Sequence, residues 1–189
     1  MDRRAELAER VLDYVLEHGL IGLSLRPLAA ALGTSDRMLI YHFGSKERLV
    51  GDALALAQQR LAASIEPPGA EVRTIGDLVR YLWTALDNAS SRQATRLYLD
   101  LSVLTTQDPE RWRTAVEQLR APWHEPLRLG LAAFGVPAAE TRAVADLILG
   151  TLDGLALDRL VAGDPSRADA AAAAFADLLD SRHPSGTSP

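Results

Sequence analysis

The sequence contains no cysteine in its 189 residues. Disulfide bonds, thiolate zinc sites and cysteine nucleophiles are therefore excluded, and we expect a protein of the reducing cytoplasm. The first residues, MDRRAELAER, are charged from the second position onward, so we expect no secretory signal. No uninterrupted apolar run approaches the roughly 18 residues that a membrane span needs, so we expect no membrane partner.

The sequence also lacks the motifs that indicate common enzymes. It has no G-x-S-x-G, no phosphate-binding loop, no dinucleotide fingerprint and no H-E-x-x-H. Its histidines are His18, His42, His124 and His183, and none of them pairs at i, i+4 to form a helical metal site. We therefore expect no catalytic activity, no metal and no cofactor.

Positive charge is scarce, and Lys46 is the only lysine. The net charge of −5 argues against a nucleic-acid binder if it is taken as an average. Residues 24–50, however, carry four basic and two acidic side chains, a net charge of +2, whereas residues 51–189 carry 13 arginines and 18 acids, a net charge of −5. Because salt screens surface charges beyond about 10 Å, a basic patch on an acidic protein still permits local phosphate contacts.

Apolar residues recur at helical spacing along the whole chain, which predicts an all-α protein. The stripe over residues 8–15 has i, i+3, i+4, i+7 spacing and predicts a first helix that ends at Gly19. The same spacing over residues 25–32 predicts a short second helix, capped by Ser24 and ended by Gly33.

A third and a fourth helix follow directly. Thr34 is the predicted cap of the third helix, in which Leu39 and Phe43 share an inward face. Gly44 ends that helix, and Ser45 is the predicted cap of a fourth that continues to about residue 64. Residues 4–50 thus have the outline of a helix-turn-helix, and we expect residues 1–50 to form the DNA-binding domain, with the fourth helix as a connector to about residue 65.

The remaining chain predicts a second helical region over residues 66–183, followed by a disordered tail at 184–189. Helices are expected near 74–88, 92–106, 108–134, 138–162 and 166–182, and no β-type alternation is visible. Pro122 and Pro126 predict a break or kink near 121–126.

Two of these later helices have features of a subunit interface. The segment LILGTLDGLALDRLVAG is apolar on most sides, and Gly150 and Gly154 lie one turn apart, which allows another backbone to approach closely beside Leu155. The segment ADAAAAAFADLL allows packing at similarly short range. A tightly packed hairpin within one chain is the alternative explanation.

The first turn of the third helix carries side chains suited to DNA. A recognition helix presents its first turn to bases and backbone in the major groove. Thr34 and Ser35 can donate to phosphate oxygens, and Arg37 suits a bidentate contact with guanine. Asp36 can accept from a cytosine amino group or, more simply, complement the helix dipole. Tyr41, His42 and Lys46 follow, where they can clamp one strand.

Residues 4–50 resemble the DNA-binding domain of TetR-family transcriptional regulators. The resemblance lies in HGLIGLSLRPLAAALGTS and above all in LIYHFGSKERL, where Tyr41, His42, Phe43 and Lys46 occupy the family's positions. Arg26 matches a position of the second helix that often reaches DNA.

This sequence departs from the family pattern at two positions. Ile40 stands where the family usually has the first of two aromatic residues, and Arg37 stands where the residue is usually small. We therefore expect base readout to depend on Arg37, with Ile40 against a thymine methyl group.

The resemblance implies a ligand-binding and dimerisation domain in residues 66–183, with the last two helices forming a four-helix interface. It implies a homodimer that binds a palindromic double-stranded DNA operator, with recognition helices roughly 34–36 Å apart. It also implies a repressor that is released by a small-molecule effector. A dimeric helical adaptor that uses the helix-turn-helix for protein contacts is the alternative.

Residues that could contact an effector are harder to choose, because most large rings of residues 66–183 are expected in the core. The candidates are two of these rings, Trp83 and Tyr98, together with Trp123 and His124 between the two prolines, and Asp153, an acid inside an apolar helix.

Overall fold

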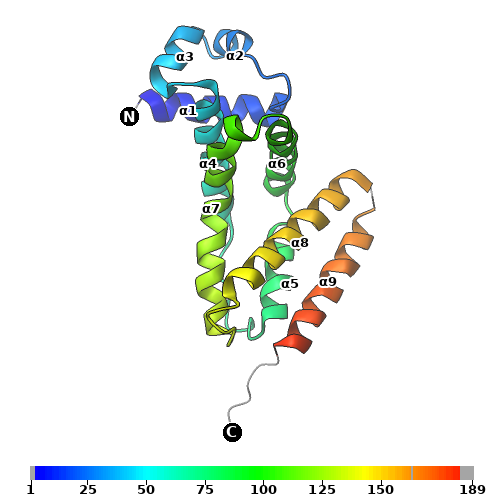
Figure 1. The fold of residues 1–189 in the computed structure, drawn as a ribbon. Coiled ribbons are helices and arrows are strands. Elements are labelled where there is room, and N and C mark those ends of the chain that lie inside the picture. Colours follow the sequence, from blue (N-terminus) through cyan, green and yellow to red (C-terminus); the bar gives the residue numbers. More distant parts are fainter. Residues whose placement is uncertain (1–2, 163, 184–189) are drawn as a thin grey trace. The chain divides into compact units, whose positions relative to one another are not determined.

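The structure is a computed structural model that describes residues 3–162 and 164–183. Within these residues the secondary structure is helical and contains no strand, as the sequence predicted (Figure 1). The helices are α1 (Arg3–His18), α2 (Leu25–Ala31), α3 (Asp36–Phe43), α4 (Lys46–Ser64), α5 (Ile75–Ala85), α6 (Ala89–Gln107), α7 (Pro109–Ala133), α8 (Thr141–Ala162) and α9 (Pro165–Arg182).

The first compact unit consists of residues up to Ser64 together with Gln93–Pro122. In it α1 packs on α4, and α3 packs on both α2 and α4. Its core is continuous from the helix-turn-helix into α6 and α7, and it includes Leu28, Leu39 and Leu101, all fully buried. The helix-turn-helix is therefore held by one apolar core that continues into α6 and α7.

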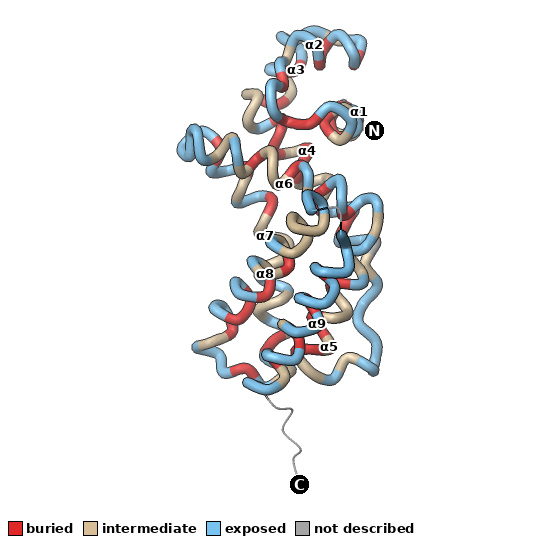
Figure 2. Tube along the Cα trace, turned by 90° about the vertical axis from the view of Figure 1, so that its right-hand side faces the viewer, coloured by how far each residue is buried: buried red, intermediate tan, exposed pale blue. Residues whose placement is uncertain are grey.

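The second compact unit consists of Ile65–Arg92 together with the residues from Trp123 onward. Here α9 packs along α5 and α8, and α8 and α9 run side by side as an antiparallel pair (Figure 1). Buried residues recur along one side of α8 and α9 and alternate with exposed ones, which Figure 2 shows as red and blue bands. Ala168, Ala172 and Ala176 form the buried side of α9.

These compact units differ from the linear division expected near residue 65, because residues 93–122 pack with the N-terminal helices. Helices α6 and α7 each contribute residues to both units. The functional division into a DNA-binding domain and a C-terminal domain stays a prediction, and the predicted tail at 184–189 lies outside the described residues.

Most predicted helix ends are confirmed, with two corrections. Of the break or kink predicted near 121–126, the break is wrong, because α7 runs from Pro109 to Ala133 without interruption, and the kink stays a prediction. The cap of α3 is Ser35 and not Thr34: the Ser35 hydroxyl accepts a hydrogen bond from the Met38 amide over 3.2 Å. No helix in the described part of the chain is long and apolar enough to cross a membrane.

Candidate nucleic-acid interface

The turn between α2 and α3 is set by local backbone geometry. Gly33 has a φ of +63°, a left-handed conformation that glycine adopts without strain. The Thr34 amide then donates to the Ala29 carbonyl oxygen over 2.9 Å, which closes the turn. Ser35 follows in an extended conformation and begins α3. This sharp turn lets α3 lie across α2 with one face free.

The buried and exposed faces of α3 are clearly separated. Leu39 is fully buried and Phe43 is 2% exposed, so these two residues hold α3 to the first unit's core. On the outer face Tyr41 is 78% exposed and Ile40 is 37% exposed. Arg37 is exposed as well. Three side chains of different chemistry, a cation, a branched apolar group and a phenol, are thus presented together.

Two polar residues of the first turn are already engaged inside the protein. The Ser35 hydroxyl caps the helix, and Asp36 Oδ1 accepts from the Arg37 amide over 2.8 Å. An acid at this position stabilises the positive end of the helix. Of the two roles considered for Asp36, the geometry thus favours complementing the helix dipole over reading a cytosine.

The end of α3 places Tyr41 beside His42. Their rings meet edge to face with centroids 5.3 Å apart, and His42 is half-buried whereas Tyr41 projects into solvent. Gly44, with a φ of +83°, ends the helix, and its amide donates to the Ile40 carbonyl. The exposed phenol is therefore supported by a neighbouring ring and is available for an external contact.

Lys46, at the start of α4, is engaged by the protein's own backbone. Its Nζ donates to the carbonyl oxygen of Leu23, which lies just before α2. Partial burial lowers the pKa of Lys46, and the nearby charge of Arg111 lowers it further, whereas Glu47 raises it. This lysine is thus partly withdrawn from solvent.

The neighbouring Glu47 forms an ion pair across the first unit. Its Oε1 accepts from Arg111 Nε, on α7, over 2.6 Å. Burial raises the pKa of Glu47, but hydrogen bonds from its own backbone amide, from Arg111 and from Ser45 outweigh burial and hold the pKa below its ordinary value. The beginning of α4 is therefore fixed to α7 by a charged contact.

Sequence reasoning missed one exposed residue of α3 and one of the neighbouring loop. Met38 is 42% exposed on α3, and Ile21, in the loop before α2, is 59% exposed. Helical spacing from the buried Leu39 and Phe43 could have placed Met38 on the open side. Arg26, on α2, is exposed as the resemblance requires, whereas Thr34 is half-buried. Contacts of all these residues with DNA stay predictions.

Trp83, a predicted effector contact, is part of the second unit's core. It is buried, and its indole Nε1 donates to Asp169 Oδ1 over 2.9 Å. The guanidinium of Arg159 lies 5.2 Å from the ring centroid, within cation–π range, and Arg159 also pairs with Asp87 and Asp169. Trp83 therefore joins α5 to α8 and α9.

The other predicted effector contacts belong to both units. His124 Nδ1 lies 3.0 Å from Asp146 Oδ1, which joins α7 to α8. Trp123 and Asp153 are half-buried in the second unit, and Tyr98 is half-buried against the first unit's core. Their role in effector binding stays a prediction. The described residues contain no cluster of acidic and histidine side chains that could hold a metal ion.

The predicted interface residues lie on an open face of α8. Gly150 and Gly154 are exposed, and a Cβ atom added at either would have no atom within 4 Å apart from its chain neighbours and its own helix backbone. Leu155 instead packs against the second unit's core. Large apolar side chains are exposed on α8 and α9 as well, namely Leu147 at 52%, Val161 at 72% and Leu178 at 66%.

Comparison with known proteins identifies the N-terminal helices. The family described as "Bacterial regulatory proteins, tetR family" matches residues 15–53, which include α2, α3 and the start of α4. The helix-turn-helix thus matches the tetR family model. The resemblance predicted from the LIYHFGSKERL motif is thus confirmed. A comparison with curated protein sequences finds no match.

Solved structures with the TetR fold match nearly the whole chain. A protein described as a TetR-family transcriptional regulator from Rhodococcus sp. is 18% identical with a TM-score of 0.73, and the match covers 94% of this chain and 97% of that one. A transcriptional regulator from Streptomyces coelicolor A3(2) is 19% identical with a TM-score of 0.67, covering 94% and 99%. The multidrug binding protein EbrR, complexed with imidazole, is 24% identical with a TM-score of 0.66, covering 95% of each chain.

These likenesses show that the chain has the TetR-type fold, with an N-terminal helix-turn-helix and further helices beyond it. TetR-family regulators are DNA-binding transcription factors and not enzymes. Helix α3 is the second helix of the helix-turn-helix, and its exposed Arg37, Ile40 and Tyr41 lie on the surface that faces away from the core. Recognition of DNA by this helix stays a prediction.

Proposed function

We propose that this protein is a ligand-responsive transcriptional repressor that binds a palindromic operator as a homodimer. The observation that carries the proposal is the outer face of α3, where Arg37, Ile40 and Tyr41 are exposed while Leu39 and Phe43 anchor the helix. A rigid helix with a solvent-facing cation and apolar groups fits the major groove, where Arg reads guanine and an apolar side chain meets a thymine methyl group.

The departure from the family pattern at Arg37 and Ile40 supports an operator particular to this protein. A bidentate arginine–guanine contact is worth about 1–3 kcal/mol of discrimination against a wrong base. Arg37→Ala should therefore lower affinity and relax the preference at one base pair of each half-site. Arg26, on α2, should contribute to affinity without specifying a base, because phosphates are the same in every sequence.

The dimer is proposed to form through α8 and α9. Leu147, Gly150, Gly154 and Val161 lie at helical spacing along one exposed side of α8, and Leu178 is exposed on α9. Exposed apolar side chains on neighbouring helices favour burial against a second copy. Two copies related by a twofold axis would present two recognition helices to inverted half-sites.

A small-molecule effector is proposed to act through the second unit and the helices shared with the first. EbrR, which shares 24–25% identity with this chain, is a multidrug binding protein complexed with proflavin and with ethidium. This supports testing planar aromatic cations as the first candidate effectors. The protein can adopt one state that binds the operator and one that does not. Release requires only that the effector bind the second state more tightly than the first.

The decisive test is selection from a random double-stranded DNA pool at stated near-physiological salt. Wild-type protein should enrich an inverted repeat. Arg37→Ala should enrich either no site or a site in which one base pair of each half-site is no longer specified. A folded dimer that enriches no sequence would contradict the proposal, and the helix-turn-helix surface would then serve protein contacts. Addition of proflavin or ethidium to the selected complex tests release.

A further inference from the structure

The two ends of the helix-turn-helix segment are joined by one side chain. Leu23 immediately precedes the N-cap residue of α2, and Lys46 begins α4 three residues after Phe43, the last residue of α3. Lys46 Nζ donates to the Leu23 carbonyl oxygen across 23 positions of sequence. The hydrogen bond therefore closes a ring of chain that contains all of α2 and α3.

The loop that receives this hydrogen bond has no helix or strand of its own, and Leu20 and Leu23 hold it to the first unit's core. It lies between α1 and α2 and contains two left-handed glycines, Gly19 and Gly22, with φ of +79° and +76°. Its beginning is attached to α6, because the Leu20 amide donates to Asp100 Oδ2 over 2.7 Å. Its end is attached to α4 by Lys46. Each end of the loop thus has one charged partner from a distant part of the sequence.

We propose that Lys46 is a positioning residue that fixes α2 and α3 in their DNA-binding arrangement, and not a phosphate contact. The proposal rests on the DNA-binding function proposed above. A hydrogen bond to a carbonyl oxygen contributes more free energy when its donor is charged than when its donor is neutral. This single contact is therefore a substantial constraint on the loop. Partial burial, which also lowers the pKa of Lys46, limits its approach to an external phosphate.

The two possible roles of Lys46 predict different salt dependence. A lysine that neutralises a phosphate releases counterions, so its removal lowers the slope of log affinity against log salt by about one. A positioning lysine changes the fraction of protein that is competent to bind, which lowers affinity at every salt concentration by the same factor. Lys46→Met removes the ammonium while keeping a chain of similar length.

The first experiment measures operator affinity of wild type and Lys46→Met from low to high salt. The control is Arg48→Met, which removes one exposed cation from the same end of α4. We expect Lys46→Met to bind about tenfold more weakly with an unchanged salt slope. A slope lower by about one, or an unchanged affinity, would overturn the proposal.

The second experiment needs no DNA. Amide hydrogen exchange is measured in the free protein, where a residue that only contacts phosphate has no effect. Lys46→Met should accelerate exchange of the Leu23 and Leu28 amides, which donate to Leu20 and Ser24 at the loop and the start of α2. Arg48→Met should leave the exchange rates of these two amides unchanged. Neither variant should change the exchange rate of the Leu78 amide, which lies in the second unit. Unchanged exchange in Lys46→Met would also overturn the proposal.

The two experiments separate failure of this proposal from failure of the proposed function. If wild-type protein selects no DNA sequence, the DNA-binding function fails, and the exchange measurement still decides whether Lys46 holds the loop. If wild type binds DNA and Lys46→Met loses salt slope, the DNA-binding function stands and Lys46 contacts phosphate.

Discussion

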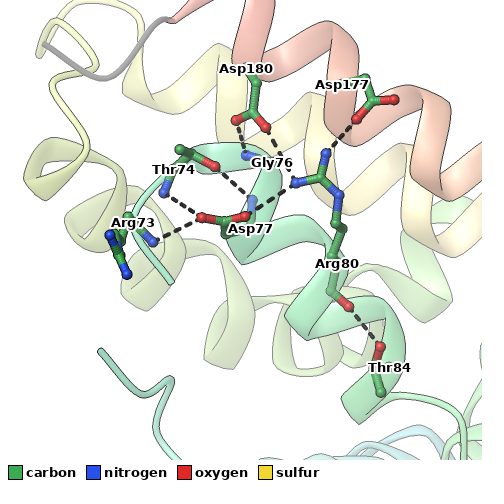
Figure 3. Close-up of polar contacts among 8 residues, drawn as sticks. All are labelled: Arg73, Thr74, Gly76, Asp77, Arg80, Thr84, Asp177 and Asp180. Atoms are coloured by element: carbon green, nitrogen blue, oxygen red, sulfur yellow. Dashed lines mark hydrogen bonds and ion pairs between the residues drawn. The ribbon is translucent and has the colours of Figure 1, made fainter. Parts of the chain in front are cut away.

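Asp180, near the end of α9, accepts a hydrogen bond from the backbone amide of Gly76, at the start of α5, over 2.7 Å. Arg80 on α5 extends this contact, because it pairs with Asp77 and Asp180 at 3.3 Å and also with Asp177 (Figure 3). The N-terminal amide of one helix and an arginine one turn later thus bind the carboxylates of another. The packing of α5 on α9, which anchors the inner side of the proposed interface helix, depends on this close approach.

Gly76→Ala should destabilise the second unit. A methyl group at this position would clash with Asp180 Oδ2 and lie 2.6 Å from the backbone carbonyl oxygen of Ala176, so α5 and α9 would have to separate. Overpacking of this kind typically costs about 1–3 kcal/mol. Chemical denaturation followed by circular dichroism measures the free energy of unfolding.

The matched control for this prediction is Gly130→Ala on α7. An added methyl group there meets no other atom of the chain, and alanine restricts the unfolded chain and favours the helix. We expect Gly130→Ala to stabilise the protein by about 0.5–1 kcal/mol. Equal effects of the two substitutions would contradict the importance of the contact at Gly76.

Asp77 should make stability depend on pH at acid values. The hydrogen bond from the Arg73 backbone amide lowers the pKa of Asp77 most, and burial opposes it. Hydrogen bonds from Thr74 and the charge of Arg80 add to the lowering, so the pKa lies below its ordinary value of 3.8. A carboxylate with a lowered pKa in the folded state contributes stability above pH 3.8, and that contribution disappears as pH falls through the folded-state pKa.

Asp77→Asn should therefore lower the free energy of unfolding at neutral pH by about 1 kcal/mol, through loss of the charged half of the capping box. The difference between the variant and wild type should shrink as pH falls below 3.8. Urea denaturation at a series of pH values from 7 to 3 checks both statements. A difference that is constant over this range would show that the charge of Asp77 is unimportant.

Phe43 and Tyr41, two residues apart on α3, should respond oppositely to truncation. Phe43 is buried, so Phe43→Ala should cost about 3–5 kcal/mol and unfold the helix-turn-helix. Tyr41 is 78% exposed, so Tyr41→Ala should change stability by less than about 0.5 kcal/mol while weakening operator binding. Thermal denaturation and fluorescence anisotropy with selected DNA measure the two effects. Normal DNA affinity in folded Tyr41→Ala would exclude this residue from the interface.

Local features of the sequence were sufficient to predict the helix-turn-helix. Apolar spacing, glycines at helix ends and hydroxyl caps are all determined within a few residues, so the limits of α1 to α4 could be predicted. The break expected at Pro122 and Pro126 was wrong because local propensity competes with packing. Leu119 and Leu131, on either side of the prolines, are buried in the cores of their respective units, and this burial outweighs a local cost of roughly 3 kcal/mol per proline.

Contacts between distant helices could not be predicted in the same way. Glu47 pairs with Arg111 across 64 positions, and nothing in the sequence distinguishes Arg111 from the other arginines after residue 50. The hydrogen bond from Lys46 to the Leu23 carbonyl oxygen could not be predicted either, because every residue has a backbone carbonyl whatever its side chain. Spacing within a helix specifies its inner face, but the register between two helices is set by the packed core as a whole.

The proposed dimer gives the sharpest test of how α8 and α9 are used. Leu147→Arg places a charge on the exposed face of α8, and in a twofold dimer the same charge comes from both copies. We expect the variant to be a folded monomer by sedimentation velocity and to bind the operator at least tenfold more weakly, because each half-site is then bound without the effective concentration that a dimer supplies. Leu129→Arg on α7 is the matched control, since Leu129 is 58% exposed and Leu147 is 52% exposed. The control should remain a dimer. If Leu147→Arg is also a dimer and binds the operator with wild-type affinity, the interface does not lie on this face of α8.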